Sequence, residues 1–356
     1  ITVPISTGPS RTTSRRHPAR AFAAIVAGAA LATSGLALAA PATAATGDIT
    51  VSDATFEWTV SNEAGGGAFF GGCNFLSAGT AGDTGSSRLW AAADGLFKST
   101  DGNVSVVKPK ADGTLEPTTW ANKCLTPAGR AVSAGQTAST SGGRVQISDG
   151  AGVIRADGSG EIAWDGSFSI VFYGGLTYWS ISDPVLTWDA NGTNRQLTGT
   201  ASGFGTSMED MTQWVPIAPE EIVLANLANL QVGANTIAGT PAYAGVEITT
   251  ASTLQTRTGA NWGAFPQSFV DFNQKTGQSS YWYSSGGARD AAKPANGFSV
   301  SFTATDDGGT TEPEVGAGDI IVEVPEAPEV PETGAFGWAW ANETAVDLGT
   351  AAVDGN

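Results

Sequence analysis

The 356-residue chain contains 47 glycines, only 14% charged residues, and 34 acidic against 17 basic residues, for a net charge of −17 at pH 7. A chain this acidic repels nucleic acid and anionic membrane surfaces, so we expect neither as a partner. The only histidine, His17, lies in the N-terminal leader. The rest of the chain therefore lacks the commonest general base and metal ligand, and we expect a non-catalytic protein.

Residues 1–44 are predicted to be a signal peptide. An apolar, alanine-rich stretch, Ala21–Ala40, follows a basic region that contains Arg11, Arg15, Arg16 and Arg20. Small residues at Ala42 and Ala44 match the positions that a signal peptidase reads, so we place cleavage after Ala44. The alternative is a membrane-spanning helix, but polar residues interrupt the stretch. We expect a protein that is secreted or held at the cell surface, with a net charge of −21 once the leader is removed.

From residue 50 onward the chain has the composition of a β protein, rich in Gly, Thr, Ser and Val and without long helical periodicities. Tight hairpin turns are predicted at Asp101-Gly102, Asp112-Gly113, Asp157-Gly158 and Asn191-Gly192, because Asp or Asn followed by Gly readily adopts positive φ angles. The strands expected in this part are 144–148, 153–156, 161–164, 168–173, 176–188 and 195–204. Pro184 is expected at a bulge or an edge.

One short helix is predicted in the C-terminal part. Pro266 stands at its start, apolar residues follow three apart, and Gly277 lies beyond its end. An alternating strand at 297–302 closes the domain. The expected fold is mainly β, an antiparallel β-sandwich-like domain over residues 50–304 with one short helix.

An acidic, Pro- and Glu-rich linker is predicted over residues 305–334, followed by an internal repeat. Phe56, Trp58, Asn62 and Glu63 keep the same spacing as Phe336, Trp338, Asn342 and Glu343. We therefore expect residues 335–356 to be the start of a second, truncated module.

The two cysteines, Cys73 and Cys124, lie in turn-rich segments of an exported chain. An oxidising compartment favours a disulfide between them. A catalytic thiol is not expected, because no histidine is available beside it.

Three acidic residues near aromatic side chains, Glu161, Asp165 and Asp183, could supply the carboxylate pair of a glycosidase. Each is more simply explained as a strand-end or turn residue, and no motif of catalysis accompanies them. We predict no catalytic residues, and a glycan hydrolase is the least favoured function.

Aromatic residues are the stronger signal, and they crowd the central hairpin at Phe172, Tyr173, Tyr178, Trp179 and Trp188. Neighbouring residues of a strand face opposite sides, so one face of each pair belongs to the core and the other is a candidate for exposure. Core packing explains most of these rings, and a platform for a ligand is the alternative. Gly174-Gly175 leaves backbone room for a bulge or for a flat ligand.

The run Trp164–Leu176, followed by Ile181–Pro184, resembles the central motif of HtaA domains, which are secreted modules of actinobacteria named after a corynebacterial haem-uptake surface protein. The resemblance extends over about residues 50–304. It implies a β-rich secreted domain that is often repeated and often tethered to the envelope. Haem-binding members use a tyrosine near the domain start as the iron ligand and a histidine in the central hairpin to support it.

This chain departs from that pattern at both positions. Tyr173 stands where the family has the histidine, and Phe69 and Phe70 occupy the region of the tyrosine. Because a phenyl ring cannot ligate iron, we expect Tyr173 to be the metal ligand if haem is bound. The expected ligand-binding residues are Tyr173, Phe172, Phe69, Phe70 and Tyr178, with Met208 and Met211 as further candidate ligands.

Two functions remain open at this point. The first is a surface module that binds haem or another flat hydrophobic molecule. The second is a structural or adhesive envelope module that has no cofactor and contacts components of the cell envelope.

Overall fold

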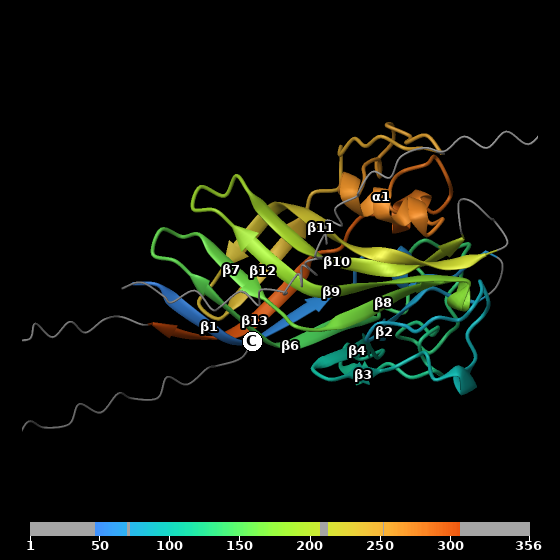
Figure 1. The fold of residues 1–356 in the computed structure, drawn as a ribbon, viewed down its shortest axis with the longest axis horizontal. Helices are drawn as coiled ribbons and strands as arrows, with labels where there is room; N and C mark the ends of the chain where they lie inside the picture. Colours follow the sequence, from blue (N-terminus) through green and yellow to red (C-terminus); the bar gives the residue numbers. More distant parts are fainter. Residues whose placement is uncertain (1–46, 70–71, 207–212, 252, 307–356) are drawn as a thin grey trace, which may run out of the picture. The chain divides into compact units, whose positions relative to one another are not determined.

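The computed structural model describes residues 47–69, 72–206, 213–251 and 253–306 (Figure 1). All of the described residues belong to one compact unit. The predicted signal peptide, the linker after Asp306 and the second repeat all lie outside the described residues. The described part is mainly β with one α-helix, as the sequence predicted.

The strands are paired antiparallel throughout the described sheet. They are β1 (Ile49–Trp58), β2 (Phe75–Ala78), β3 (Thr100–Asp101), β4 (Val104–Pro109), β5 (Leu115–Pro117), β6 (Arg144–Ile154), β7 (Gly160–Ala163), β8 (Ser167–Phe172), β9 (Thr177–Trp188), β10 (Arg195–Thr206), β11 (Trp214–Val232), β12 (Thr236–Pro241) and β13 (Phe298–Asp306). The helix α1 spans Gln267–Lys275, and short 3-10 turns occur at Glu63–Gly65, Ala92–Asp94, Tyr173–Gly175, Ser279–Tyr281 and Asp290–Ala292.

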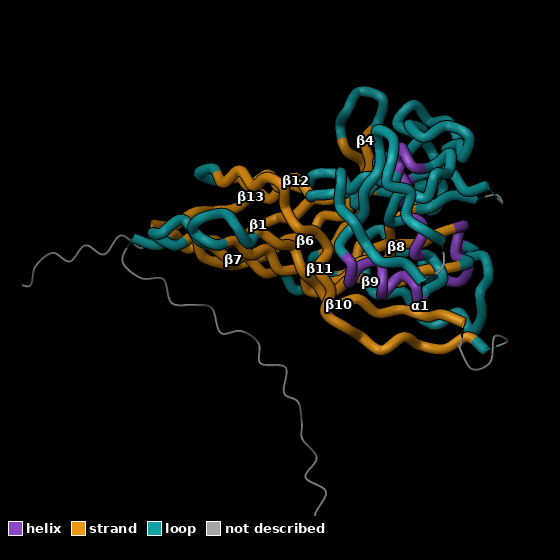
Figure 2. The backbone as a smooth tube through the Cα atoms, turned by 90° about the horizontal axis from the view of Figure 1, so that it is seen from above, coloured by secondary structure: helices purple, strands orange, loops and turns teal. Residues whose placement is uncertain are grey.

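Eight of these strands close into a ring in the order β9-β10-β11-β12-β13-β1-β6-β7, with β7 paired back to β9. One edge of β6 is shared between β4, at residues 144–147, and β7, at residues 151–154. One edge of β9 is shared in the same way between β8, at residues 177–182, and β7, at residues 185–188. β7 therefore joins β6 to β9 at only one end of these two strands. Figure 2 shows loops and helical turns gathered around β4, β8, β9 and α1, at the end away from β7 and β13.

Bulges bend three strands of the ring, each at an aspartate that follows a serine. Asp53, Asp149 and Asp183 have left-handed backbones with φ of 51°, 61° and 51°, and the pairings of β1, β6 and β9 shift register around them. The prediction of separate strands at 144–148 and 153–156 was wrong, because the Asp149 bulge joins them into the single strand β6. The bulge at Asp183 confirms the placement of Pro184.

The predicted turns and helix are present, but Tyr173, which was expected to end the strand 168–173, lies in the turn after β8 because its backbone is left-handed. The glycines of the four predicted turns, Gly102, Gly113, Gly158 and Gly192, have φ between 59° and 86°, and each lies between two of the strands. Pro266 directly precedes α1, and Gly277 follows its end with φ of 76°. No helix among the described residues is long and apolar enough to cross a membrane.

Two separate apolar clusters bury the central hairpin β8–β9 from both sides. Phe172 and Trp179 belong to the main core, where they pack against Trp282, close to Phe269 and Phe272 of α1. Val171 and Tyr178 belong to a second cluster with Cys73, Phe75, Ala81 and Trp90. The second cluster thus covers the hairpin face that we had considered a candidate for exposure.

Candidate functional site

The turn that joins β8 to β9 has an unusual backbone. Tyr173, Gly174 and Gly175 have φ of 52°, 70° and 122°, so three consecutive residues lie at positive φ. A Cβ atom at Gly175 would lie 2.2 Å from the Trp90 ring, so only glycine fits there. Tyr173 pays a conformational cost in the left-handed region, and such strain in a folded protein is concentrated at functional sites.

Two loops from the N-terminal half hold this turn in place. The Gly174 amide donates to the Cys73 carbonyl at 2.9 Å, and the Trp90 amide donates to the Gly174 carbonyl at 2.9 Å. The Tyr173 amide donates to Oδ1 of Asn74 at 3.0 Å. Cys73 forms a disulfide with Cys124, with 5.7 Å between the Cα atoms, as the sequence predicted. The disulfide therefore anchors the loop on which the turn rests.

Two exposed apolar side chains lie on the loops that hold the turn. Phe69, on the loop that Cys73 closes, is 61% exposed, and Leu89, next to Trp90, is 59% exposed. A Cβ at Gly174 would lie 3.3 Å from the Leu89 side chain. The half-buried Tyr173 ring packs edge-to-face on Tyr281, with 5.9 Å between the ring centroids. We call Leu89, Tyr173 and Tyr281 the tyrosine edge.

A buried ion pair lies behind the tyrosine edge. Glu63 is 2% exposed and Arg289 is 6% exposed. Nε of Arg289 donates to Oε2 of Glu63 at 2.8 Å, and Nη2 lies 2.7 Å from the same oxygen. Burial raises the pKa of the Tyr173 phenol, and the negative charge of Glu63 raises it further. Burial also raises the pKa of Glu63 itself, and Arg289 only partly opposes that rise.

The predicted ligand-binding residues are only partly brought together. The contacts with the Tyr173 turn come from Cys73 and Asn74, which follow Phe69 in the chain. Phe172 is 0% exposed and Tyr178 is 1% exposed, so both rings belong to the two cores. The Tyr178 hydroxyl donates to the Gly82 carbonyl at 2.8 Å. Phe70, Met208 and Met211 lie outside the described residues.

Tyr173 and Tyr281 are the two tyrosines whose rings are partly accessible. Tyr178, Tyr243 and Tyr283 are buried. Within the described part of the chain, no group of three or more His, Cys, Asp or Glu side chains could hold a metal ion.

The carboxylates considered for glycan hydrolysis lie on exposed positions. Glu161 is in β7, Asp165 lies between β7 and β8, and Asp183 is at the bulge of β9. Oδ1 of Asp183 accepts a hydrogen bond from the Gly166 amide at 3.1 Å. This contact gives Asp183 a role in the bulge.

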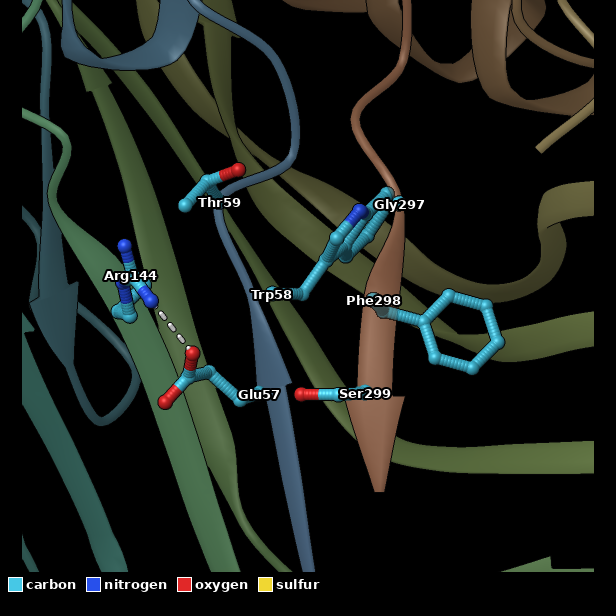
Figure 3. Close-up of a pocket in the computed structure, with 7 residues that line it drawn as sticks. All are labelled: Glu57, Trp58, Thr59, Arg144, Gly297, Phe298 and Ser299. Atoms are coloured by element: carbon cyan, nitrogen blue, oxygen red, sulfur yellow. Dashed lines mark hydrogen bonds and ion pairs between the residues drawn. The ribbon is translucent and has the colours of Figure 1, made fainter. Parts of the chain in front are cut away.

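Two surface depressions lie away from the tyrosine edge. The first, of about 310 Å³, is lined by Glu57, Trp58, Thr59, Arg144, Gly297, Phe298 and Ser299 (Figure 3). In it, Nη1 of Arg144 points toward Glu57 and lies 2.6 Å from its Oε1. The second, of about 430 Å³, is lined by Thr249, Thr250, Ala251, Gln267 and Asp271. None of the predicted ligand-binding residues lines either depression.

Sequence reasoning missed the Glu63–Arg289 pair. Its members are 226 residues apart, and no local pattern joins them. One signal was present: Glu63 is among the residues that recur in the repeat at Glu343. Phe56 and Trp58, which recur as well, are buried in the main core.

No protein-family profile and no curated protein matches the chain. Among solved structures, the crystal structure of the C-terminal domain of HtaA from Corynebacterium glutamicum is similar to this chain at 13% sequence identity, with a TM-score of 0.33. The similarity covers 72% of this chain and 99% of that domain. A similarity of this size establishes neither a family nor a function.

Proposed function

We propose that this domain is a non-catalytic, secreted surface module that binds haem or another flat hydrophobic molecule at the tyrosine edge. In this proposal the Tyr173 oxygen is the iron ligand, and Phe69 and Leu89 contact the faces of the ligand. The observation that carries the proposal is the strained, half-buried Tyr173, held by two loops beside exposed apolar side chains.

The chemistry of these residues fits a haem group. A phenolate oxygen is a known axial ligand of haem iron. Aromatic and aliphatic side chains suit a flat macrocycle. Arg88 precedes Leu89, is 42% exposed and pairs with Asp94 at 2.7 Å; in this proposal its guanidinium also pairs with a carboxylate substituent of the ligand. The resemblance of residues 164–176 to HtaA domains is consistent with the same ligand class.

The surface location is part of the proposal. Disulfides form and persist in oxidising compartments, and the predicted leader would deliver the chain to one. A net charge of −17 argues against anionic lipid and nucleic acid as partners.

A haemin titration followed by absorbance tests the proposal. We expect saturable binding with the charge-transfer bands of a high-spin ferric phenolate. Tyr173→Phe removes only the hydroxyl and should abolish these bands, whereas the matched variant Tyr281→Phe should retain them. Loss of the bands in Tyr281→Phe alone would move the ligand to that residue and contradict the assignment.

A structural or adhesive envelope module without a cofactor is the second candidate. The burial of Phe172 and Tyr178 in two cores favours it, because these rings are fully used in packing. It predicts no saturable haemin binding by the wild type, together with binding to isolated cell envelopes. That pair of results would replace the haem proposal.

A further inference from the structure

Lys108 carries a buried amine with weak polar contacts. It lies in β4, on the side of the strand that also carries Val104 and Val106, and it is 2% exposed. Its Nζ lies 3.4 Å from the carbonyl oxygen of Pro109 and 3.9 Å from Oε1 of Glu116. Both distances are long for a charge-assisted hydrogen bond. Burial of an ammonium group with contacts this long costs free energy that an uncharged side chain would not.

Glu116 connects this amine to a third side chain. In the pairing of β4 with β5, Glu116 stands directly opposite Lys108, so the two side chains leave the sheet on the same face. Oε1 of Glu116 also accepts a hydrogen bond from Nδ2 of Asn122 at 3.3 Å. One carboxylate oxygen therefore lies beside both the amine of Lys108 and the amide nitrogen of Asn122.

The side-chain amide of Asn122 is held at both of its polar atoms. Its Oδ1 accepts a hydrogen bond from the Thr119 backbone amide at 2.6 Å, and its Nδ2 also donates to the Pro117 carbonyl at 3.2 Å. A fixed donor on Oδ1 stabilises the negative charge that develops on this oxygen when a nucleophile adds to the amide carbon. The three side chains thus supply a nucleophile, a proton-transfer group and a polarised carbonyl with its leaving nitrogen.

We propose that Lys108 and Asn122 form an intramolecular amide cross-link, with Glu116 as the proton-transfer group. A bond forms between Nζ of Lys108 and Cγ of Asn122, and the bond between Cγ and Nδ2 breaks. The flexible four-carbon stem of lysine gives Nζ the reach for this step. Glu116 relays two protons from the lysine ammonium to Nδ2, which leaves as an ammonium ion. Atoms and charge balance, no electron is transferred, and no other reactant is needed.

The cross-link acts together with the disulfide. Asn122 lies two residues before Cys124, which is bonded to Cys73. The new bond would tie β4 to the same segment, and it would replace the buried ammonium of Lys108 by an uncharged amide. Two covalent ties would then hold the part of the domain on which the Tyr173 turn rests. The inference does not depend on haem binding.

An intact-mass measurement of the full chain, with the disulfide reduced, tests the proposal. We expect the folded protein to be lighter than the mass calculated from its sequence by about 17 Da, the mass of the ammonia that leaves. Lys108→Arg, Glu116→Gln and Asn122→Ala should each have the full calculated mass. The matched control is Lys98→Arg, which replaces an exposed lysine that also lies beside an acid, Asp101, at 3.1 Å. It should keep the mass deficit.

A tryptic digest locates the lost ammonia. Trypsin cuts after Lys110 and Lys123, so the cross-link should join residues 99–110 to residues 111–123 in one branched peptide. Asn191-Gly192 is a second place where ammonia can leave, because an asparagine before glycine can close a succinimide on its own backbone. A deficit carried by the peptide that contains Asn191, with residues 99–110 and 111–123 recovered separately, would overturn the proposal.

The test does not depend on the folding of any variant, because the branched peptide is sought in the wild type. The full calculated mass in folded wild-type protein would overturn the proposal and leave Lys108 and Glu116 as an ion pair. A branched peptide that persists in Glu116→Gln would keep the cross-link and reject the role of Glu116.

Discussion

The Glu63 carboxylate lies 2.7 Å from Nη2 of Arg289 in the interior of the domain, although 226 residues separate the two in the chain. The contact joins the loop after β1 to the segment before β13, the first and last strands described. These two strands are also neighbours in the ring. The ion pair therefore adds a polar connection at the place where the two ends of the domain meet.

Removing one partner of this pair should be costly. We expect Arg289→Met to lower the free energy of unfolding by about 3–5 kcal/mol, because it leaves a buried carboxylate without its counter-charge. The double variant with Glu63→Gln should recover most of that loss. Urea unfolding measures both values.

The control for this prediction is the pair of Arg144 and Glu57 in the first depression. Their side chains are 28% and 23% exposed, so Arg144→Met should cost only about 0–1 kcal/mol. Equal losses of unfolding free energy in Arg289→Met and Arg144→Met would mean that burial does not increase the contribution of the Glu63 pair to stability.

The disulfide should stabilise both the fold and the tyrosine edge. Cys73 and Cys124 are 51 residues apart, and closing such a loop contributes about 3–4 kcal/mol in the chain-entropy estimate. We expect the double change Cys73→Ser with Cys124→Ser to lower stability by that amount and to weaken haemin binding, because the Cys73 carbonyl holds the Tyr173 turn. Thiol labelling of the unreduced wild type should find no free thiol, and two reactive thiols would contradict the prediction.

The bulge in β6 gives a local test of backbone strain. Asp149 has φ of 61°, which glycine adopts freely and alanine does not. Asp149→Ala should unfold about 1–2 kcal/mol more easily than Asp149→Gly, because both changes remove the carboxylate and only alanine keeps the Cβ. Thermal unfolding compares the two variants directly, and equal stabilities would show that the backbone relaxes at this bulge.

Features that depend on neighbouring residues could be predicted from the sequence. The turn at Asn191-Gly192 and the helix after Pro266 follow from local backbone preferences, and both are present. The bulge at Asp149 was missed, although the Ser-Asp pair at 148–149 recurs at 52–53 and 182–183. The significance of that pair emerges only when the register of the paired strands is known.

Features that depend on distant residues could not be predicted. Tyr178 is buried because Phe75 and Trp90, far earlier in the chain, pack on its side of the hairpin. The alternation of residues along a strand does not show whether that face of the hairpin is buried or exposed. Tyr173 was selected through its motif but was expected in a strand, and Glu63 was noticed only as part of the repeat.

The raised pKa of Glu63 predicts a pH dependence with a definite sign. Between the ordinary pKa of 4.5 and the raised pKa, the Glu63 carboxyl is mostly protonated in the folded protein and mostly ionised in the unfolded chain. The contribution of Glu63 to the free energy of unfolding is therefore largest below this window and is lost as pH rises through it. We expect the stability advantage of the wild type over Glu63→Gln to shrink as the pH is raised from 4.5, measured by urea unfolding at a series of pH values. An advantage that grows over the same range would show that the charge of Arg289 outweighs the burial of the carboxylate.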